Sequence, residues 1–125
     1  MSDPARDETT DFLPRFDMNG LLTVIVEDAE TGETLMLAHA NADALALTRT
    51  TGIAHFWSRS RSEVWRKGAT SGNELPVETI LVDCDQDALL YRVLPGGRVA
   101  CHTGRRSCFY RELPLGADDP TLRFR

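Results

Sequence analysis

Three aspartates occur at alternate positions in a short acidic run near the middle of the chain: Asp83, Asp85 and Asp87. If this run continues a β-strand in extended form, the three carboxylates share one side and Cys84 points to the other. Three carboxylates on one edge repel each other unless a cation lies among them, and such hard oxygen ligands suit Mg²⁺ or Ca²⁺. An EF-hand is excluded, because neither its turn glycine nor its bidentate glutamate is present at the required position. A merely solvated acidic strand end is the alternative.

The cysteines form a second group of candidate metal ligands: Cys84, Cys101 and Cys108. Their spacing matches no common zinc finger, and the sequence contains no C-x2-C pair. The loop after Cys101 could fold the last two thiols together, and its arginines favour the thiolate, the form that binds metal. Three protein ligands with an open fourth position are typical of a catalytic zinc site, whereas three ordinary buried cysteines are the alternative.

Aromatic, hydroxyl and basic side chains are interleaved in residues 56–73. Arginine forks and hydroxyls suit phosphate, and an aromatic face could stack on a flat heterocycle. The segment contains neither a Walker loop nor a G-x-G-x-x-G turn. It therefore indicates a phosphate-binding surface of another kind, or else an amphipathic surface strand.

The formal net charge of −5 is unevenly distributed, since residues 1–50 are net acidic and residues 51–111 are net basic. A general nucleic-acid binder is usually basic overall. The pattern fits better with a local pocket for a small anion, and a salt-bridged surface would explain the charges equally well.

The elements that must position these groups are predicted to be mainly β-strands of one domain, because 125 residues are too few for two ordinary domains. Strands are expected over residues 21–26, 34–38, 53–58, 77–82, 89–94, 99–102 and 108–111. One helix is expected over residues 42–47, with Asn41 as its N-cap and Gly52 just past its end. The predicted fold class is mainly β, an α+β domain with one or two helices that forms a small sheet or sandwich.

The ends of the chain differ from its middle in composition. We expect residues 1–14 to form a flexible N-terminal arm, because they are polar and contain two prolines, residues 15–112 to form the folded domain, and residues 113–125 to form a C-terminal tail. No apolar stretch approaches the roughly 20 residues that span a bilayer, and the acidic N-terminus lacks a signal-peptide pattern. An odd number of cysteines without an export signal indicates a reducing compartment, so the cytoplasm is expected.

Three blocks of sequence resemble the phosphoribosyl-AMP cyclohydrolases of histidine biosynthesis: residues 55–73, 83–90 and 100–111. The likeness extends from about Phe16 to Arg111, which makes residues 15–112 the cyclohydrolase domain. The last block is the most specific, because a dozen residues of mixed chemistry match in order. Residues 112–125 leave no room for the pyrophosphatase domain that is fused to some relatives, so the single-activity form is expected.

The resemblance implies a hydrolase that depends on zinc and opens the adenine ring of phosphoribosyl-AMP at the N1–C6 bond. It implies one zinc ion per subunit on Cys84, Cys101 and Cys108, and Mg²⁺ on Asp83, Asp85 and Asp87. It also implies an intertwined homodimer whose zinc site lies at the subunit interface. Neither a nucleic acid nor a membrane is an expected partner.

The resemblance also indicates which side chains act on the substrate. We expect His102, next to a zinc ligand, to take or shuttle a proton, although a role in orienting water is the milder interpretation. For the two substrate phosphates, Arg59, Arg61 and Lys67 could hold one end and Arg105 and Arg106 the other, with Ser71 as a further candidate.

Two other classes of protein are alternatives. A zinc-dependent nucleobase deaminase would also use water at a purine C6, but its H-x-E and P-C-x-x-C elements are absent from this sequence. A non-catalytic binding module stabilised by zinc would require a saturated site with four ligands.

Overall fold

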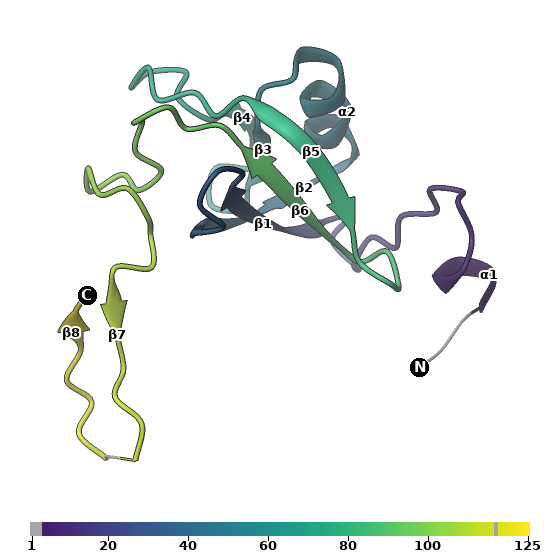
Figure 1. Ribbon diagram of the computed structural model, residues 1–125. Helices are drawn as coiled ribbons and strands as arrows, with labels where there is room; N and C mark the ends of the chain where they lie inside the picture. The colour runs from purple at the N-terminus through teal and green to yellow at the C-terminus, as the bar shows by residue number, and fades with distance from the viewer. Residues whose placement is uncertain (1–3, 117) are drawn as a thin grey trace.

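The computed structural model describes residues 4–116 and 118–125, and a four-stranded mixed sheet lies at its centre (Figure 1). The strands, in their order across the sheet, are β2 (Thr34–Ala40), β1 (Leu22–Asp28), β6 (Ala88–Val93) and β5 (Val77–Val82). Strand β1 pairs antiparallel with β2 and parallel with β6, and β5 pairs antiparallel with β6. The two central strands, β1 and β6, therefore carry the most extensive pairing.

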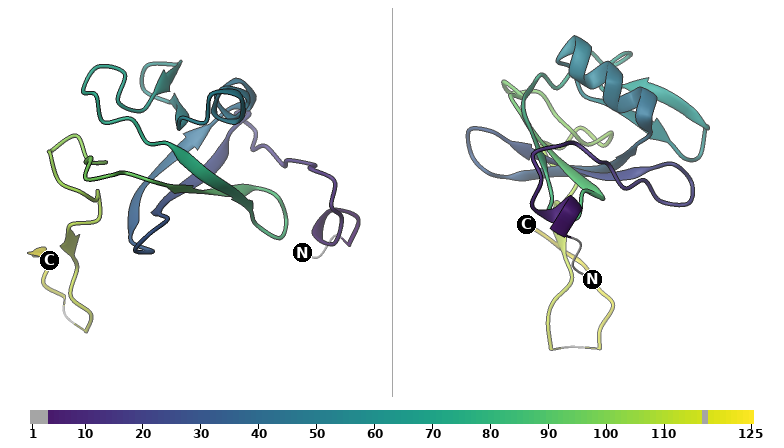
Figure 2. Two further views of the ribbon diagram at one scale, coloured as in Figure 1. Left: turned by 45° about the horizontal axis from the view of Figure 1, so that its top comes forward. Right: turned by 90° about the vertical axis from the view of Figure 1, so that its right-hand side faces the viewer.

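The remaining elements are short. Helix α2 (Ala42–Thr51) and the hairpin of β3 (His55–Ser58) and β4 (Glu63–Arg66) pack on one face of the sheet. A single helical turn, α1 (Pro4–Asp7), begins the described chain. A hairpin of β7 (Arg111–Glu112) and β8 (Arg123–Phe124) projects away from the sheet, as Figures 1 and 2 show. These elements confirm the predicted fold class. No helix among the described residues is long and apolar enough to cross a membrane.

Alternation along β1 shows how the sheet builds the core. Val24 and Val26 are fully buried, whereas Ile25 between them is only partly covered, because successive side chains of a strand point to opposite faces. Tyr91 of β6 and Phe56 of β3 complete the core, with their ring centroids 6.0 Å apart. One face of the sheet is therefore packed and the other is open.

The predicted ends of the helix are confirmed. The Asn41 side chain accepts a hydrogen bond from the Ala44 amide at 2.8 Å, as an N-cap does. Gly52 follows the helix in the left-handed region at φ 74°, and its amide donates to the Thr48 carbonyl. The helix continues to Thr51, so it is longer than the range of good helix formers indicated.

Two of the expected strands are wrong. Residues 99–102 lie in a loop that closes on itself, because the Cys101 amide donates to the Arg105 carbonyl at 3.1 Å. Of residues 108–111, only Arg111 lies in a strand. Strand β4 was not expected, and the range 77–82 is confirmed.

Candidate functional site

A cavity of about 680 Å³ lies between the β4 strand with its following loop and the loop after β6. Two separate stretches of sequence contribute its walls. The first stretch supplies Arg61, Lys67 and Ser71, and the second supplies Cys101 and His102. The structure therefore brings part of the predicted phosphate-binding set into the same cavity as the predicted proton acceptor and one predicted zinc ligand.

The wall that carries Ser71 depends on a close approach of two backbone segments at Gly68. A Cβ atom at this position would lie 2.2 Å from the Glu74 amide nitrogen and 2.3 Å from the Asn73 carbonyl carbon. Gly68 also has φ 84°, in the left-handed region where glycine is favoured. The Gly72 amide donates to the Gly68 carbonyl at 2.8 Å and closes the loop.

Two of the three cysteines meet in the loop after β6. The Cys101 and Cys108 thiols lie close enough to shift each other's pKa, and the Thr103 hydroxyl lies 3.0 Å from the Cys101 sulfur. The Cys108 amide donates to the Leu35 carbonyl at 2.7 Å, which fixes the end of this loop against β2. The Ser107 hydroxyl is buried and donates to the Thr34 carbonyl at 2.7 Å. Strand β2 therefore positions the thiol pair.

The thiols and a nearby ammonium group perturb each other. Burial acts to raise the pKa of Cys101, but hydrogen bonds from Thr103 and Cys108 outweigh it and lower the pKa overall. Burial, together with the neighbouring Cys101, raises the pKa of Cys108 to about 11. Burial lowers the pKa of Lys67, whose ammonium faces both thiols. The pair therefore favours one thiolate, which is the form that binds metal.

The third cysteine lies elsewhere in the fold. Cys84 is in the turn between β5 and β6, at the opposite end of the sheet from the Cys101 loop (Figure 1). The six residues of β6 separate these two places, and a strand of that length spans about 20 Å. Among the described residues of one chain, the three sulfurs do not gather at one point.

The acidic run is not extended, so the predicted alternation of its side chains is wrong. It forms the turn between β5 and β6, and Gln86 within it has φ 59°. Nevertheless the turn groups the three predicted carboxylates, because oxygens of Asp83, Asp85 and Asp87 all lie within 4.8 Å of one another. The sequence grouped these three aspartates from an incorrect backbone geometry, and their binding of Mg²⁺ stays a prediction.

Crowding of these carboxylates changes their protonation. A hydrogen bond with Asp85, followed by one with Asp83, raises the pKa of Asp87 to about 6. The same bond from Asp87 lowers the pKa of Asp85. The guanidinium nitrogen of Arg15 lies 3.9 Å from an Asp85 oxygen. The raised pKa of Asp87 reflects the mutual repulsion of these carboxylates, which a bound cation would reduce.

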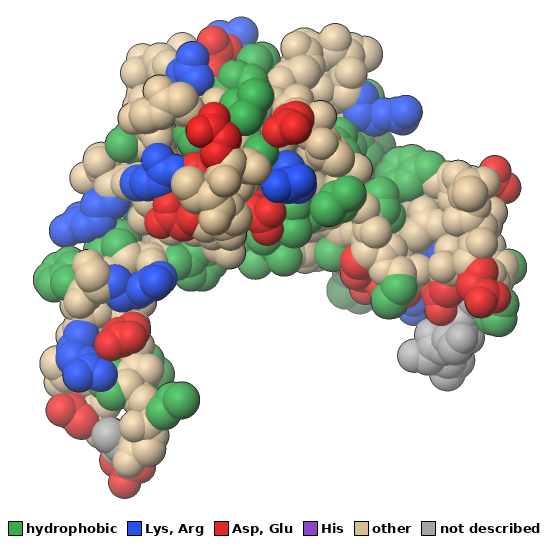
Figure 3. Space-filling view, viewed as in Figure 1, with side chains coloured by type: hydrophobic (Ala, Val, Ile, Leu, Met, Phe, Trp, Pro, Cys, Tyr) green, Lys and Arg blue, Asp and Glu red, His purple; other side chains and the backbone are tan. Residues whose placement is uncertain are grey.

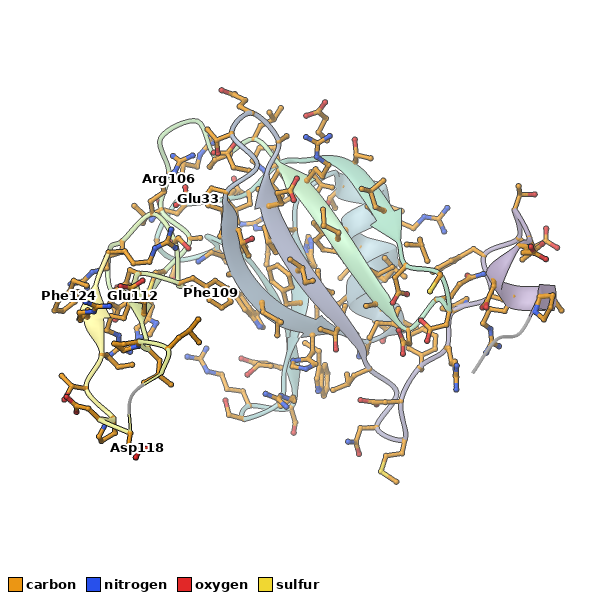
Figure 4. All side chains as sticks on the ribbon, turned by 60° about the horizontal axis from the view of Figure 1, so that its bottom comes forward. Glu33, Arg106, Phe109, Glu112, Asp118 and Phe124 are labelled. Atoms are coloured by element: carbon orange, nitrogen blue, oxygen red, sulfur yellow. The ribbon has the colours of Figure 1, made fainter. Side chains whose placement is uncertain are left out.

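Arg106 contacts acidic side chains of the β1–β2 turn. Its guanidinium is paired with the carboxylate of Asp28, which is only 2% exposed, and its Nε lies 2.6 Å from a Glu33 oxygen (Figure 4). The second oxygen of Asp28 accepts a hydrogen bond from the Glu30 amide at 2.8 Å. Arg106 therefore joins the thiol-bearing loop to the turn between the first two strands.

Two more of the arginines that were predicted to bind phosphate, Arg105 and Arg59, also lie outside the cavity wall. The Arg105 guanidinium lies 4.1 Å from the centre of the Tyr110 ring. Arg59 lies near His39, whose pKa is lowered by burial and then by this cation. Of the predicted phosphate-binding residues, the cavity thus contains Arg61, Lys67 and Ser71 in the described chain.

Comparison with known proteins shows which family shares this arrangement. A family model described as phosphoribosyl-AMP cyclohydrolase matches residues 36–110. A phosphoribosyl-AMP cyclohydrolase of Sphingopyxis alaskensis is 66% identical over 111 residues, which are 89% of this chain and 87% of the relative. Relatives with the same name from Chelativorans and Erythrobacter litoralis are 59% and 60% identical, and each alignment covers at least 86% of both chains.

The chain belongs to the phosphoribosyl-AMP cyclohydrolase family. This confirms the resemblance stated from the sequence. The range matched by the cyclohydrolase model includes the candidate metal ligands and the cavity wall, and it excludes the N-terminal segment before residue 36.

Three side chains that shape this cyclohydrolase site were missed from the sequence: Asp28, Gln86 and Thr103. Asp28 ends a buried strand and precedes a Glu-Thr-Gly turn, which is a signal for an Asx-turn. Its pairing with Arg106 joins residues 78 positions apart, and no local pattern indicates such a contact.

The Asp28–Arg106 pair predicts a large effect on stability. We expect Arg106→Ala to lower the free energy of unfolding by about 2 kcal/mol, because a buried carboxylate loses its cation. Urea denaturation measures this difference. Arg105→Ala is the matched control in the same loop, and its loss should stay near about 0.5–1 kcal/mol. Equal losses for the two variants would contradict the prediction, whereas adding Asp28→Asn to Arg106→Ala should recover part of the loss.

Proposed function

We propose that this chain hydrolyses phosphoribosyl-AMP and opens its adenine ring at the N1–C6 bond, as a step of histidine biosynthesis. The observation that carries this proposal is that Cys101 and His102 line the same cavity as Lys67 and Ser71. A metal-binding thiol, a proton acceptor and phosphate-binding groups thus share one space. The names of the relatives agree with this activity.

The reaction adds one water molecule and breaks one bond. The ribosyl phosphate on N1 withdraws electron density from the ring and makes C6 electrophilic. The water oxygen bonds to C6, the C6–N1 bond breaks, and N1 takes up a proton. The product is an imidazole carboxamide that carries a formamidine arm, and no oxidant or reductant is consumed.

We assign the proton transfer to His102. Its exposed imidazole lies on the cavity wall, directly after Cys101 in the chain. A general base must lie within hydrogen-bonding reach of the water that it deprotonates. We propose that the imidazole nitrogen of His102 receives the proton of the water that attacks C6.

The residues present fit zinc. The Cys101 and Cys108 thiols are neighbours that shift each other's pKa, with the Lys67 ammonium nearby, and thiolates are preferred zinc ligands. We propose that Cys84, Cys101 and Cys108 hold one zinc ion per subunit. When bound, zinc supplies the Lewis acidity that makes water nucleophilic at neutral pH.

The basic wall suits one end of the substrate. Arg61, Lys67 and Ser71 line the cavity, and together they offer two cations and a hydroxyl to a phosphate. The ion pair of Arg61 with Glu63 is weak, because their charged atoms are 3.8 Å apart and both side chains are exposed to solvent. We propose that this wall binds the phosphate nearest the reacting ring.

The acidic turn suits a hard divalent cation. Oxygens of its three carboxylates lie within 4.8 Å of one another, and their crowding raises the pKa of Asp87 to about 6. Carboxylate oxygens are the ligands that Mg²⁺ prefers in proteins. We propose that Asp83, Asp85 and Asp87 bind Mg²⁺, which would relieve their mutual repulsion.

Two chains are needed to complete the zinc site. Because β6 separates Cys84 from the other two thiols, we propose a homodimer in which Cys84 of one chain meets Cys101 and Cys108 of its partner. A second chain also explains the apolar surface. On the open face of the sheet, four aliphatic side chains from successive strands form one row: Leu37, Ile25, Leu90 and Leu81. The two at its ends are each 49% exposed.

The projecting β7–β8 hairpin supports the same assembly. It extends clear of the remaining surface in Figure 3. Its apolar side chains are exposed, with Leu115 at 98% and Phe124 at 71%. Exposed apolar surface of this kind marks protein interfaces, so we propose that the partner chain covers this hairpin.

We propose that the enzyme works in the cytoplasm. The three cysteines are free in the structure. A reducing compartment keeps such thiols available for metal rather than oxidised to disulfides.

Ring opening and its dependence on metal test the proposed function together. Purified protein should convert phosphoribosyl-AMP, and the ultraviolet absorbance should change as the adenine ring opens. A zinc chelator should reduce the rate by at least about 10²-fold, because water then loses its activation, and added Zn²⁺ should restore it. Elemental analysis should give about one zinc per chain.

The release of ammonia distinguishes the alternative reaction. A deaminase would expel the exocyclic amino group, whereas ring opening retains it in the carboxamide. Ammonia formed in step with substrate loss would contradict the proposal, and so would full activity in metal-free protein.

A further inference from the structure

Gln86 differs from the rest of the acidic turn. Its side chain is 6% exposed, while Asp83 and Asp87 beside it are exposed. Its backbone has φ 59°, a left-handed conformation that residues other than glycine adopt infrequently. Such a conformation persists only when the surrounding structure holds it. The contacts of Gln86 should therefore show what holds it.

Those contacts are with the backbone of the N-terminal segment, residues 6–15. The Gln86 carbonyl oxygen Oε1 accepts from the Leu13 amide at 2.7 Å, and its Nε2 donates to the carbonyls of Arg6 and Asp11 at 3.1 and 3.2 Å. The main-chain carbonyl of Gln86 accepts from the Arg15 amide at 2.7 Å. One side chain thus uses both of its amide donors and its acceptor on a segment more than 70 positions away.

The same residue also holds the acidic turn together. The Gln86 amide donates to the Asp83 carbonyl at 3.2 Å, and the Asp83 carboxylate accepts from the Asp87 amide at 3.0 Å. The N-terminal segment brings Arg15 to within 3.9 Å of Asp85. Carboxylates packed this closely repel one another, and these bonds oppose the separation that repulsion would cause.

We propose that Gln86 is a positioning residue for the three carboxylates, and that closure of the N-terminal segment on Gln86 is coupled to divalent cation binding by the turn. The inference rests on the proposed Mg²⁺ site. Coupling between two sites is reciprocal, so a cation that favours the ordered turn also favours the closed segment, and the closed segment raises cation affinity by the same factor.

Limited proteolysis of the full-length protein loaded with zinc reports the closure. Trypsin cleaves after Arg15, and mass spectrometry follows that cut. In the wild type, Mg²⁺ should slow cleavage at this bond several-fold, because its backbone is tied to Gln86. In Gln86→Gly, cleavage should be faster and should not respond to Mg²⁺.

Direct titration reports the affinity. Mn²⁺ serves as the probe, because free Mn²⁺ is measured by its paramagnetic resonance. Gln86→Gly should weaken Mn²⁺ binding about tenfold while the zinc content stays at the wild-type level. Glycine accepts the left-handed backbone without strain, so this variant keeps the turn and removes only the side-chain bonds. Thr10→Ala, in the same segment but outside these bonds, should behave like the wild type.

The possible outcomes separate the two claims. If Asp85→Asn leaves Mn²⁺ binding unchanged, the proposed cation site is wrong and the coupling is wrong with it. If Asp85→Asn abolishes binding while Gln86→Gly keeps wild-type affinity and wild-type protection by Mg²⁺, the coupling alone is wrong. A thermal melt of each variant confirms that the chain is folded during the measurement.

Discussion

Mixing two inactive variants, Cys84→Ser and Cys108→Ser, is expected to restore about one quarter of wild-type activity. Each variant alone should lose its zinc and its turnover, because each removes one of three thiolate ligands. Random exchange gives heterodimers in about half of the molecules. In a heterodimer, one site takes Cys84 from the Cys108→Ser chain and both other thiols from its partner, so that site is intact.

The structural reason is the separation of the thiols within one chain. Cys84 precedes β6 and the other two cysteines follow it. One chain therefore has one ligand at one end of β6 and two ligands at the other end, and neither place is a complete site. Zinc analysis of the mixture should rise in step with activity. Light scattering must show that the chains exchange. If they exchange and activity does not return, a site shared between chains is excluded.

Replacement of His102 by alanine is expected to lower kcat by about 10²-fold or more, with zinc retained. The imidazole faces the cavity beside Cys101 and contributes no bond to the thiol pair among the described contacts. Steady-state kinetics and zinc analysis on the same sample measure both quantities. Retention of zinc distinguishes this variant from the cysteine variants.

Two further measurements define the role of His102. Imidazole added to the buffer should partly restore the rate of His102→Ala, since it can accept the proton in place of the side chain. His102→Asn keeps a hydrogen-bonding group without an accessible proton-transfer pKa, and it should stay as slow as the alanine variant. An unchanged kcat in His102→Ala would exclude proton transfer by this residue.

The elements with strong local signals were predictable from the sequence. The helix capped by Asn41 and followed by Gly52 is an example, because both caps act within four residues of the helix end. Strand β5 was predicted over the range that the structure shows, 77–82, since a compact apolar run favours a strand. The loop at residues 99–102 was not predictable, because its backbone bonds to Arg105 and Arg106 replace pairing with another strand.

The sequence suggested candidate residues for the site, but it did not predict how the fold arranges them. The three aspartates were grouped correctly, yet a turn rather than a strand brings them together. Arg105 and Arg106 carry the same charge in adjacent positions, but one lies over an aromatic ring and the other pairs with a buried carboxylate. Their different surroundings come from segments remote in the sequence, which composition and spacing do not encode.

Gly68 limits how this cavity can diverge. Any larger residue there would press on the main chain of Asn73 and Glu74, which cannot rotate aside as a flexible side chain can. Substitution would therefore move the whole segment that presents Ser71. A homologue with another residue at this position would therefore need a different main-chain path through this rim of the cavity.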